Sequence, residues 1–328
     1  MSDKKDKDLI RPLAALAGQK PDAPAWFKQA LGAPREDKTV SVAGATIHYS
    51  AWGSRGAPGL LLVHGGRAHR RWWFPFAPLL SENRRVAALD LSGLGDSDWR
   101  DRYSLSCHAE EIFAVCEAAG LNEGGRPIVL GHSFGGWATL GAVEMAGERL
   151  GGAIIVDSPF GVPDPDEGYT INMGGKKDGE QKERPNTNRI YASREEPISR
   201  FRFLPSQPGE ELYLIDYIAR EGLKPATDDE TSKKGWAWKF DPRHGQNFEI
   251  HFERDLFLAA RCPLAFIYGE KSLFSSGEGF DHVRNQARGR APFVVVPGGH
   301  HHMMMDQPMA FVAAVRTLLT CWPVRVGL

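Results

Sequence analysis

The sequence has few cysteines, and their spacing excludes two classes of protein. The 328 residues include four widely separated cysteines: Cys107, Cys116, Cys262 and Cys321. Small secreted domains carry a dense cysteine framework, and structural metal sites bring cysteines together at short spacings. Neither pattern is present here. We interpret the four residues as buried, apolar side chains of a protein from a reducing compartment.

The sequence also lacks an excess of charge of either sign and any long apolar run. Lys and Arg number 40 and Asp and Glu number 41, so the net charge is −1, which predicts no binding to nucleic acid or to an anionic membrane. No stretch is apolar for long enough to cross a bilayer, and the charged first residues do not resemble a secretory signal. We therefore expect a cytoplasmic protein with a small-molecule partner, and we leave its oligomeric state open.

What the sequence does contain is a set of short apolar segments separated by helix-length segments. This alternation predicts an α/β fold with a mostly parallel central sheet flanked by helices. A preceding pair, residues 39–42 and 46–52 around a glycine turn, predicts an antiparallel hairpin at the sheet edge. The expected core strands are 60–63, 86–89, 128–130, 153–156, 263–268 and 293–296.

The alternation stops after residue 158 and resumes near residue 259. The intervening segment is rich in proline, glycine and charged residues, which predicts an inserted cap, or lid, over residues 159–258. Residues 1–38 then form a polar N-terminal leader. Residues 39–158 and 259–328 form the two parts of one core.

The strongest functional signal is the segment PIVLGHSFGGWATL at residues 127–140. An apolar strand ends at Gly131-His132-Ser133-Phe134-Gly135, and a helix follows. Small residues around the serine permit a tight strand-to-helix turn that exposes its hydroxyl, and the helix N-terminus favours negative charge beside it. We therefore interpret Ser133 as a nucleophile; the alternative is a glycine-rich turn that contains a serine by chance.

These motifs resemble those of the α/β-hydrolase superfamily, and they occur in the order of that family. His64-Gly65-Gly66 follows one core strand, the segment DLSGLGDS follows the next, and GGHHHMMMDQP follows the last. The resemblance implies an α/β-hydrolase fold and a catalytic triad that requires no cofactor. Within the superfamily, the segment WKFDP and the histidine-rich stretch are similar to the serine-hydrolase-like and mesoderm-specific-transcript-like subgroup.

A tetrahedral acyl intermediate needs backbone N–H donors beside its oxygen. We expect these donors to be Gly66 and Phe134, the residue after the nucleophile. For the segment that contains Gly66, the alternative interpretation is a plain turn at the end of a strand, without a catalytic role. The resemblance places the general base in the histidine run, where spacing from Asp306 favours His301 and adjacency to Gly299 favours His300. We choose His301.

The acid of the triad is not at its usual place. After residues 266–268 the family commonly has Gly-x-x-Asp, whereas this chain has serine at position 272. Two other carboxylates are candidates. Asp157 ends the preceding core strand, a position at which some superfamily members carry their acid, and Glu270 lies in the loop itself. Because parallel strands end at one edge of the sheet, we expect Asp157 to be the acid and keep Glu270 as the alternative.

Tryptophans near these motifs are candidate substrate-binding residues. Trp236 and Trp238 alternate along a cap segment, and Trp73 follows the oxyanion loop. Each either lines a pocket or anchors the cap to the core. A metal site is not expected, because adjacent histidines do not easily converge on one ion.

Together these features predict a serine hydrolase that cleaves a carboxylic ester or lactone. The same triad could instead act on an amide, a thioester or a carbon–carbon bond, or form peracids. A non-enzymatic binding protein is the alternative from another class. Epoxide hydrolase and haloalkane dehalogenase chemistry is disfavoured, because both need an aspartate where Ser133 stands.

Overall fold

The computed structural model describes residues 10–172, 187–227, 231–245 and 249–322. Parts of the leader and of the proposed cap, including the charged stretch at 174–186, lie outside the described residues. None of the described helices is long and apolar enough to cross a membrane.

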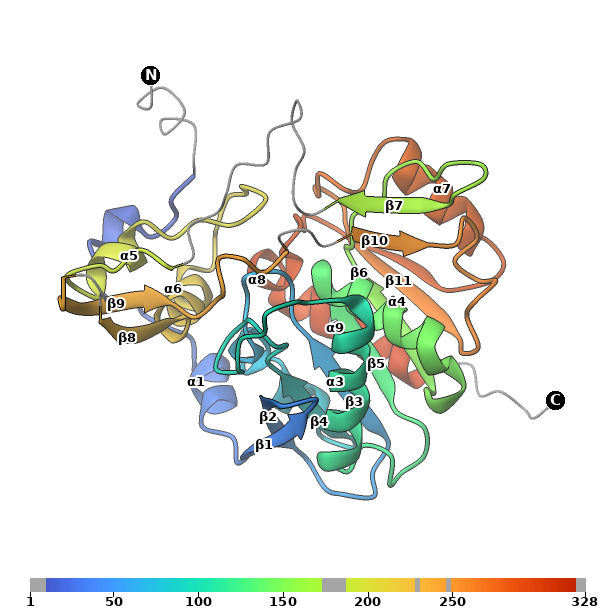
Figure 1. Ribbon diagram of the computed structural model, residues 1–328, viewed down its shortest axis with the longest axis horizontal. Coiled ribbons are helices and arrows are strands. Elements are labelled where there is room, and N and C mark those ends of the chain that lie inside the picture. Colours follow the sequence, from blue (N-terminus) through green and yellow to red (C-terminus); the bar gives the residue numbers. More distant parts are fainter. Residues whose placement is uncertain (1–9, 173–186, 228–230, 246–248, 323–328) are drawn as a thin grey trace.

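An eight-stranded sheet forms the centre of the molecule (Figure 1). Its strand order is β1-β2-β4-β3-β5-β6-β11-β12, with parallel pairing throughout except at the β1–β2 hairpin and the β2–β4 pair. The predicted fold class and edge hairpin are thereby confirmed. The strands are β1 (Glu36–Val42), β2 (Ala45–Trp52), β3 (Gly59–Val63), β4 (Arg85–Leu89), β5 (Ile128–His132), β6 (Gly152–Val156), β11 (Leu264–Gly269) and β12 (Phe293–Val296).

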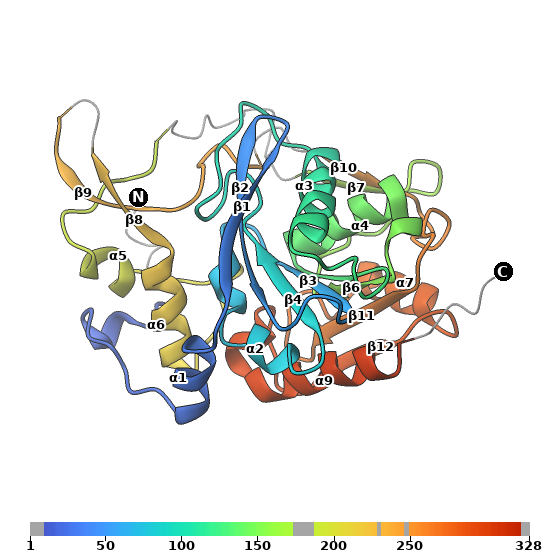
Figure 2. The same cartoon turned by 90° about the horizontal axis from the view of Figure 1, so that it is seen from below.

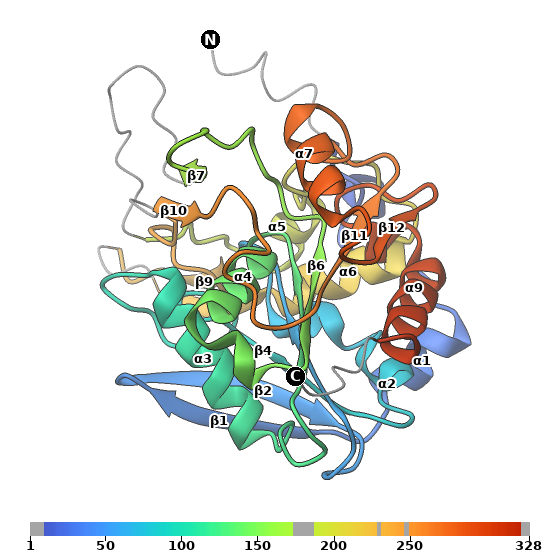
Figure 3. The same ribbon diagram turned by 90° about the vertical axis from the view of Figure 1, so that its right-hand side faces the viewer.

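Helices cover both faces of this sheet, so its central strands are buried on both sides. Figures 2 and 3 show α3 and α4 on one face and α2 and α9 on the other. Side chains alternate between two cores: Leu61 and Val63 point to the first, whereas Leu60 and Leu62 point to the second. The helices are α1 (Ala25–Leu31), α2 (Ala77–Leu80), α3 (Leu105–Ala118), α4 (Phe134–Ala146), α5 (Glu195–Ser199), α6 (Leu212–Glu221), α7 (Glu278–Ala287), α8 (Met303–Asp306) and α9 (Pro308–Thr320), with short 3₁₀ turns at Ala14–Leu16, Arg70–Trp73 and Gly147–Arg149.

The segment between β6 and β11 forms two separate groups of elements. Strands β7 (Tyr169–Asn172) and β10 (Glu249–Phe252) pair with each other at one end of the molecule. At the other end, the hairpin of β8 (Leu223–Thr227) and β9 (Lys234–Trp238) lies beside α5 and α6. The division into core and cap at residues 159 and 258 remains a proposal.

The N-terminal leader contributes ordered structure to the second of these groups. Phe27 of α1 packs edge-on against Tyr213 and Tyr217 of α6, with ring centroids 5.0 and 5.7 Å apart. Arg220 of α6 donates a hydrogen bond to the carbonyl oxygen of Gly18 at 2.6 Å. The leader is therefore an integral support of α6, despite its polar composition.

The cysteines only partly follow the sequence-based expectation. Cys116 and Cys262 are buried, as expected. Cys107 is half-buried, and Cys321 is exposed at the end of α9, so these two are not core side chains. None of these four described cysteines forms a disulfide with another.

Candidate functional site

Ser133 lies in a strained turn between β5 and α4. Its φ of 53° and ψ of −119° place it in a region that a residue with a side chain rarely adopts. The flanking glycines are required by close backbone approach. A Cβ at Gly131 would lie 2.1 Å from the carbonyl oxygen of Gly135, and a Cβ at Gly135 would lie 2.5 Å from that of His64.

The two expected oxyanion donors lie next to each other beside this turn. Phe134 is the first residue of α4, where backbone N–H groups have no acceptor within the helix. Gly66 follows β3, and a Cβ at Gly66 would lie 3.6 Å from the Cβ of Phe134. Two backbone segments far apart in the sequence therefore meet near Ser133.

His301 is the histidine that contacts Ser133. Its Nε2 lies 3.0 Å from the Oγ of Ser133, and its side chain is almost fully buried. His300 points elsewhere, because its Nδ1 and backbone N–H both contact the Oδ2 of Asp306, at 3.2 and 2.9 Å. The structure therefore brings together Ser133 and the histidine that spacing from Asp306 favours.

Asp157 is the carboxylate beside His301. Its Oδ2 lies 2.7 Å from the Nδ1 of His301, and its side chain is fully buried. A carboxylate only accepts hydrogen bonds, so Nδ1 carries the proton and Nε2 is left to accept one from the Ser133 hydroxyl. Glu270 is turned away and accepts a hydrogen bond from the Gly298 N–H at 2.8 Å.

Ser272, at the family's usual acid position, supports Asp157 directly. Its hydroxyl donates to the Oδ2 of Asp157 at 2.6 Å, and the Gly269 N–H donates to Oδ1 at 3.0 Å. Asp157 itself has a φ of 48°, a left-handed conformation at the end of β6. Sequence reasoning proposed Asp157 as the acid, which the structure places beside His301, but it missed the contact of Asp157 with Ser272. The absence of aspartate at position 272 was the signal that could have revealed it.

The histidine-rich loop is held from two sides. His132, within the elbow, donates from Nε2 to the carbonyl oxygen of His301 at 3.0 Å, and burial keeps its pKa well below the usual value, so it is neutral. From the proposed cap, Gln207 accepts a hydrogen bond from the His302 N–H at 2.8 Å and donates to both carboxylate oxygens of Asp306 at 3.1 Å. Sequence reasoning gave no sign of the contribution of Gln207.

Three histidines nevertheless gather at this point. One nitrogen of each of His132, His301 and His302 lies within 4.8 Å of the others. The histidine side chains therefore converge more closely than we expected from their adjacent positions in the sequence. Both nitrogens of His301 already contact Ser133 and Asp157, and Nε2 of His132 is committed to a carbonyl oxygen. This arrangement suits proton transfer at Ser133 better than metal ligation.

A cavity of about 360 Å³ lies between the core and the β8–β9 group. Trp238 lines it, as does Trp72 from the turn after the oxyanion loop. Trp73 lies in the core instead, where it is 1% exposed and stacks on Phe311. Trp236 is also outside the lining, with Arg194 positioned 5.0 Å over its ring. Of the three tryptophans expected at a substrate pocket, only Trp238 lines this cavity.

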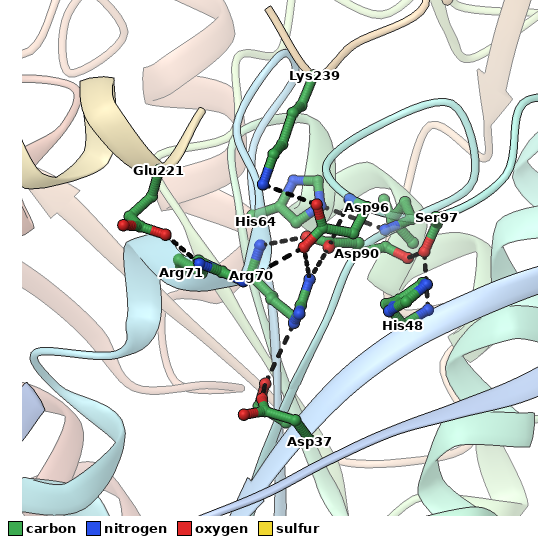
Figure 4. Close-up of polar contacts among 12 residues, drawn as sticks. Asp37, His48, His64, Arg70, Arg71, Asp90, Asp96, Ser97, Glu221 and Lys239 are labelled. Atoms are coloured by element: carbon green, nitrogen blue, oxygen red, sulfur yellow. Dashed lines mark hydrogen bonds and ion pairs between the residues drawn. The ribbon is translucent and has the colours of Figure 1, made fainter. Parts of the chain in front are cut away.

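An ionic network connects the end of β4 and the turn at Arg70–Trp73 to the segment that follows β9 (Figure 4). Asp90, at the end of β4, pairs with Arg70, which also contacts Asp96 at 2.8 Å. Lys239, just after β9, contacts the other oxygen of Asp96 at 2.7 Å. Burial opposes ionisation of Asp96, but Lys239 and Arg70 outweigh it and hold the pKa of this carboxyl well below its usual range.

Curated relatives of the chain include enzymes of different chemistry. Epoxide hydrolase 4 of Mus musculus is 22% identical over 284 residues, which span 82% of this chain and 75% of that protein. Lipase LipV of Mycobacterium tuberculosis is 29% identical over 112 residues, which span 34% of this chain and 41% of that protein.

Solved structures share the fold over nearly their whole length. The thioesterase domain from the curacin biosynthetic pathway superposes with a TM-score of 0.66 at 19% identity, covering 86% of this chain and 99% of that one. Carboxylesterase CesB from Bacillus subtilis superposes with a TM-score of 0.60 at 19% identity, and the match covers 91% of this chain and 97% of that one. A family model for the alpha/beta hydrolase family matches residues 60–315. With this match, the eight-stranded sheet and the serine elbow, the chain belongs to the alpha/beta hydrolase family.

Proposed function

We propose that this hydrolase cleaves a carboxylic ester or lactone through a covalent intermediate on Ser133. The observation that carries the proposal is the continuous contact from the Oγ of Ser133 through His301 to Asp157, with distances of 3.0 and 2.7 Å. The narrower likeness to the serine-hydrolase-like and mesoderm-specific-transcript-like subgroup remains a prediction.

In this proposal, each of these residues has a defined step. As Ser133 Oγ attacks the carbonyl carbon, Nε2 of His301 takes the hydroxyl proton, and the buried carboxylate of Asp157 stabilises the imidazolium that forms. The N–H groups of Gly66 and Phe134 stabilise the oxyanion. His301 then gives the proton to the leaving alkoxide. In the second half, His301 activates water, which releases the acid and frees Ser133.

The residue at the end of β5 separates this reaction from epoxide opening, despite the similarity to epoxide hydrolase 4. Epoxide hydrolysis in this superfamily uses a carboxylate that forms an alkyl ester, and a second attack at the carbonyl carbon then releases the product. Ser133 would instead form an ether with an epoxide carbon. An ether has no carbonyl for water to attack, so turnover would stop. An acyl group on Ser133, in contrast, is hydrolysable.

A substrate panel tests the proposal. The purified protein is assayed with esters, lactones, amides, thioesters and epoxides of matched carbon skeleton. We expect the highest kcat/KM for an ester or a lactone, and a loss of all turnover in Ser133→Ala. Ser41→Ala, an exposed serine on β1, is the matched control and should retain wild-type rates. If an amide or a thioester is turned over fastest, the proposed triad stands but the bond that the enzyme cleaves is not an ester or a lactone. Epoxide turnover that persists in Ser133→Ala would overturn the proposal.

A further inference from the structure

The cavity described above has a strongly cationic lining. Five of its lining residues are basic: Arg11, Arg67, Arg200, Arg202 and Lys239. None of the described residues that line it is Asp or Glu. Resting on the function proposed above, we propose that this cavity binds an anionic group of the substrate, a carboxylate or a phosphate, while Ser133 attacks the carbonyl carbon of the same molecule.

Ion pairs at the edge of the cavity leave a surplus of positive charge. Lys239 pairs with Asp96 at 2.7 Å, a carboxylate that Arg70 also contacts at 2.8 Å. Arg200 shares the single carboxylate of Glu196 with Arg189, each at 3.3 Å and on an exposed surface where such pairs are weak. Within the described residues, no carboxylate forms an ion pair with Arg202. Arg11 and Arg67 have interaction partners of their own, so the positive charge that carries the proposal is that of Arg202 and, in part, of Arg200.

The chemistry of the lining favours an oxyanion over a neutral group. Arginine presents several N–H donors in one plane, a geometry that matches carboxylate and phosphate oxygens. The guanidinium of Arg67 lies 5.4 Å from the ring centroid of Phe240, so an aromatic surface lies beside the charge. Trp72 and Trp238 add apolar walls. An anionic head on a short carbon chain fits this combination.

The cavity adjoins the catalytic machinery but does not include it, since Ser133 and His301 are not among its lining residues. Arg67 directly follows Gly66, an expected oxyanion donor. On the other side, the lining residue Trp72 packs on His302 with ring centroids 5.2 Å apart, and His302 follows His301. A substrate bound to both regions would hold its anionic group several bonds from the reacting carbonyl.

Matched substrates test this proposal in the wild-type protein. The probes are 4-nitrophenyl pentanoate, which is neutral, and the 4-nitrophenyl monoesters of glutaric acid and of 4-phosphonobutanoic acid, which are anionic and of similar length. We expect kcat/KM for one or both anionic esters to exceed that for the neutral ester by roughly tenfold or more, the range of a charge-assisted hydrogen bond. Added salt should reduce this ratio by screening. The two anionic probes distinguish a carboxylate site from a phosphate site.

Variants then assign the effect to the cavity. Arg202→Gln should lower the anionic-to-neutral ratio of kcat/KM about tenfold, mainly through KM. Arg290→Gln, an exposed arginine on another surface that pairs with Asp255, is the matched control and should keep the ratio. An equal kcat/KM for anionic and neutral esters in the wild type, or an unchanged ratio in Arg202→Gln, would overturn the proposal.

Binding to the Ser133→Ala variant separates this inference from the proposed reaction. Titration calorimetry with glutarate and with inorganic phosphate needs no turnover. We expect at least one of them to bind Ser133→Ala, and to bind Ser133→Ala/Arg202→Gln about tenfold more weakly. Such binding without ester hydrolysis in the wild type would remove the proposed reaction and keep the anion site. Ester hydrolysis by the wild type, without anion binding and without a preference for anionic esters, would keep the proposed reaction and remove the anion site.

Discussion

At the scale of single residues, His301 contacts a carboxylate at the end of β6, the strand next to β11, after which the family commonly has its acid. Asp157 ends β6, and its Oδ2 receives hydrogen bonds from both His301 and Ser272. A neutral serine hydroxyl cannot stabilise an imidazolium as a buried carboxylate does. In the proposed mechanism, Ser272 therefore orients the acid but cannot replace it, and Asp157 supplies the charge.

The first prediction separates the two candidate acids. Asp157→Asn should fold but lose about 10⁴-fold in kcat, because an amide can no longer fix the tautomer of His301 or stabilise its charged form. Glu270→Gln should remain close to wild type, since Glu270 only accepts a hydrogen bond from Gly298. Circular dichroism checks folding and ester hydrolysis checks kcat. The reverse pattern would transfer the role to Glu270.

The second prediction moves the acid back to the family's usual position. The Oγ of Ser272 lies 2.6 Å from the Oδ2 of Asp157, so a carboxylate at 272 would reach the same region. Ser272→Asp in the Asp157→Asn background should regain at least about tenfold of the lost kcat, a small part of the full effect. Ser272→Ala in the same background is the control and should regain nothing. Equal rates in the two double variants would show that only β6 can supply the acid.

Single residues also show where sequence reasoning stops. The motif predicted the strained turn at Ser133 because such a turn needs small neighbours at fixed spacing, and that requirement is local. The choice between His300 and His301 is not local. One extra residue in the loop changes which ring reaches Ser133, and the hydrogen bond from His132 to the His301 carbonyl, across 169 positions, helps to set that register.

At the scale of elements, the proposed cap contacts the histidine-rich loop through Gln207. Gln207 lies between α5 and α6 and is almost fully buried. It connects the backbone of His302 to the carboxylate of Asp306. The histidine loop is therefore supported by the core through His132 and by the inserted segment through Gln207.

The third prediction tests this support. Gln207→Ala leaves the buried N–H of His302 without its acceptor, at a cost of about 1–3 kcal/mol, and removes one donor from Asp306, which keeps its contacts with His300. We expect a lower Tm and a lower kcat, because the loop that carries His301 loosens. Thermal denaturation and ester hydrolysis measure the two effects. Gln29→Ala, an exposed position on α1, should change neither. A lower Tm with wild-type kcat would reduce Gln207 to a purely structural residue.

The predictability of the elements differs between core and insertion. The central strands were predictable because they are short apolar runs buried on both faces, a property that residues 60–63 or 153–156 carry by themselves. The division of the segment between β6 and β11 into two groups of elements could not be predicted in this way. β7 pairs with β10, separated from it by some eighty positions, and such pairing depends on contacts that local patterns do not encode.

At the scale of the whole molecule, buried neutral histidines couple stability to pH. Burial lowers the pKa of His69 from 6.5 to about 3, and it holds those of His132, His244 and His302 well below the usual value. Below pH 6.5 the unfolded chain therefore binds more protons than the folded protein at these positions. Glu144 acts in the opposite direction, because burial raises its pKa to about 7.

The fourth prediction concerns the change of stability on acidification. The four histidines lower the free energy of unfolding as the pH falls, and their combined effect exceeds the opposite effect of Glu144. The free energy of unfolding should fall as the pH is lowered from 6.5 to 5, by up to about 1.4 kcal/mol per pH unit for each buried histidine. Urea unfolding across this range measures the slope. His69→Gln should flatten it, whereas His251→Gln, an exposed position, should not. A flat or rising stability on acidification would contradict the prediction.

Covalent labelling of Ser133 is the most direct test of the central claim, because it reports the activated nucleophile without knowledge of the substrate. The protein is treated with a fluorophosphonate, and the adduct is located by intact mass and peptide mapping. We predict one adduct, on Ser133, with no labelling in Ser133→Ala, slow labelling in His301→Gln and a near wild-type rate in His300→Gln. A folded protein that does not react, an adduct on another residue, or equal rates in wild type and His301→Gln would contradict the account.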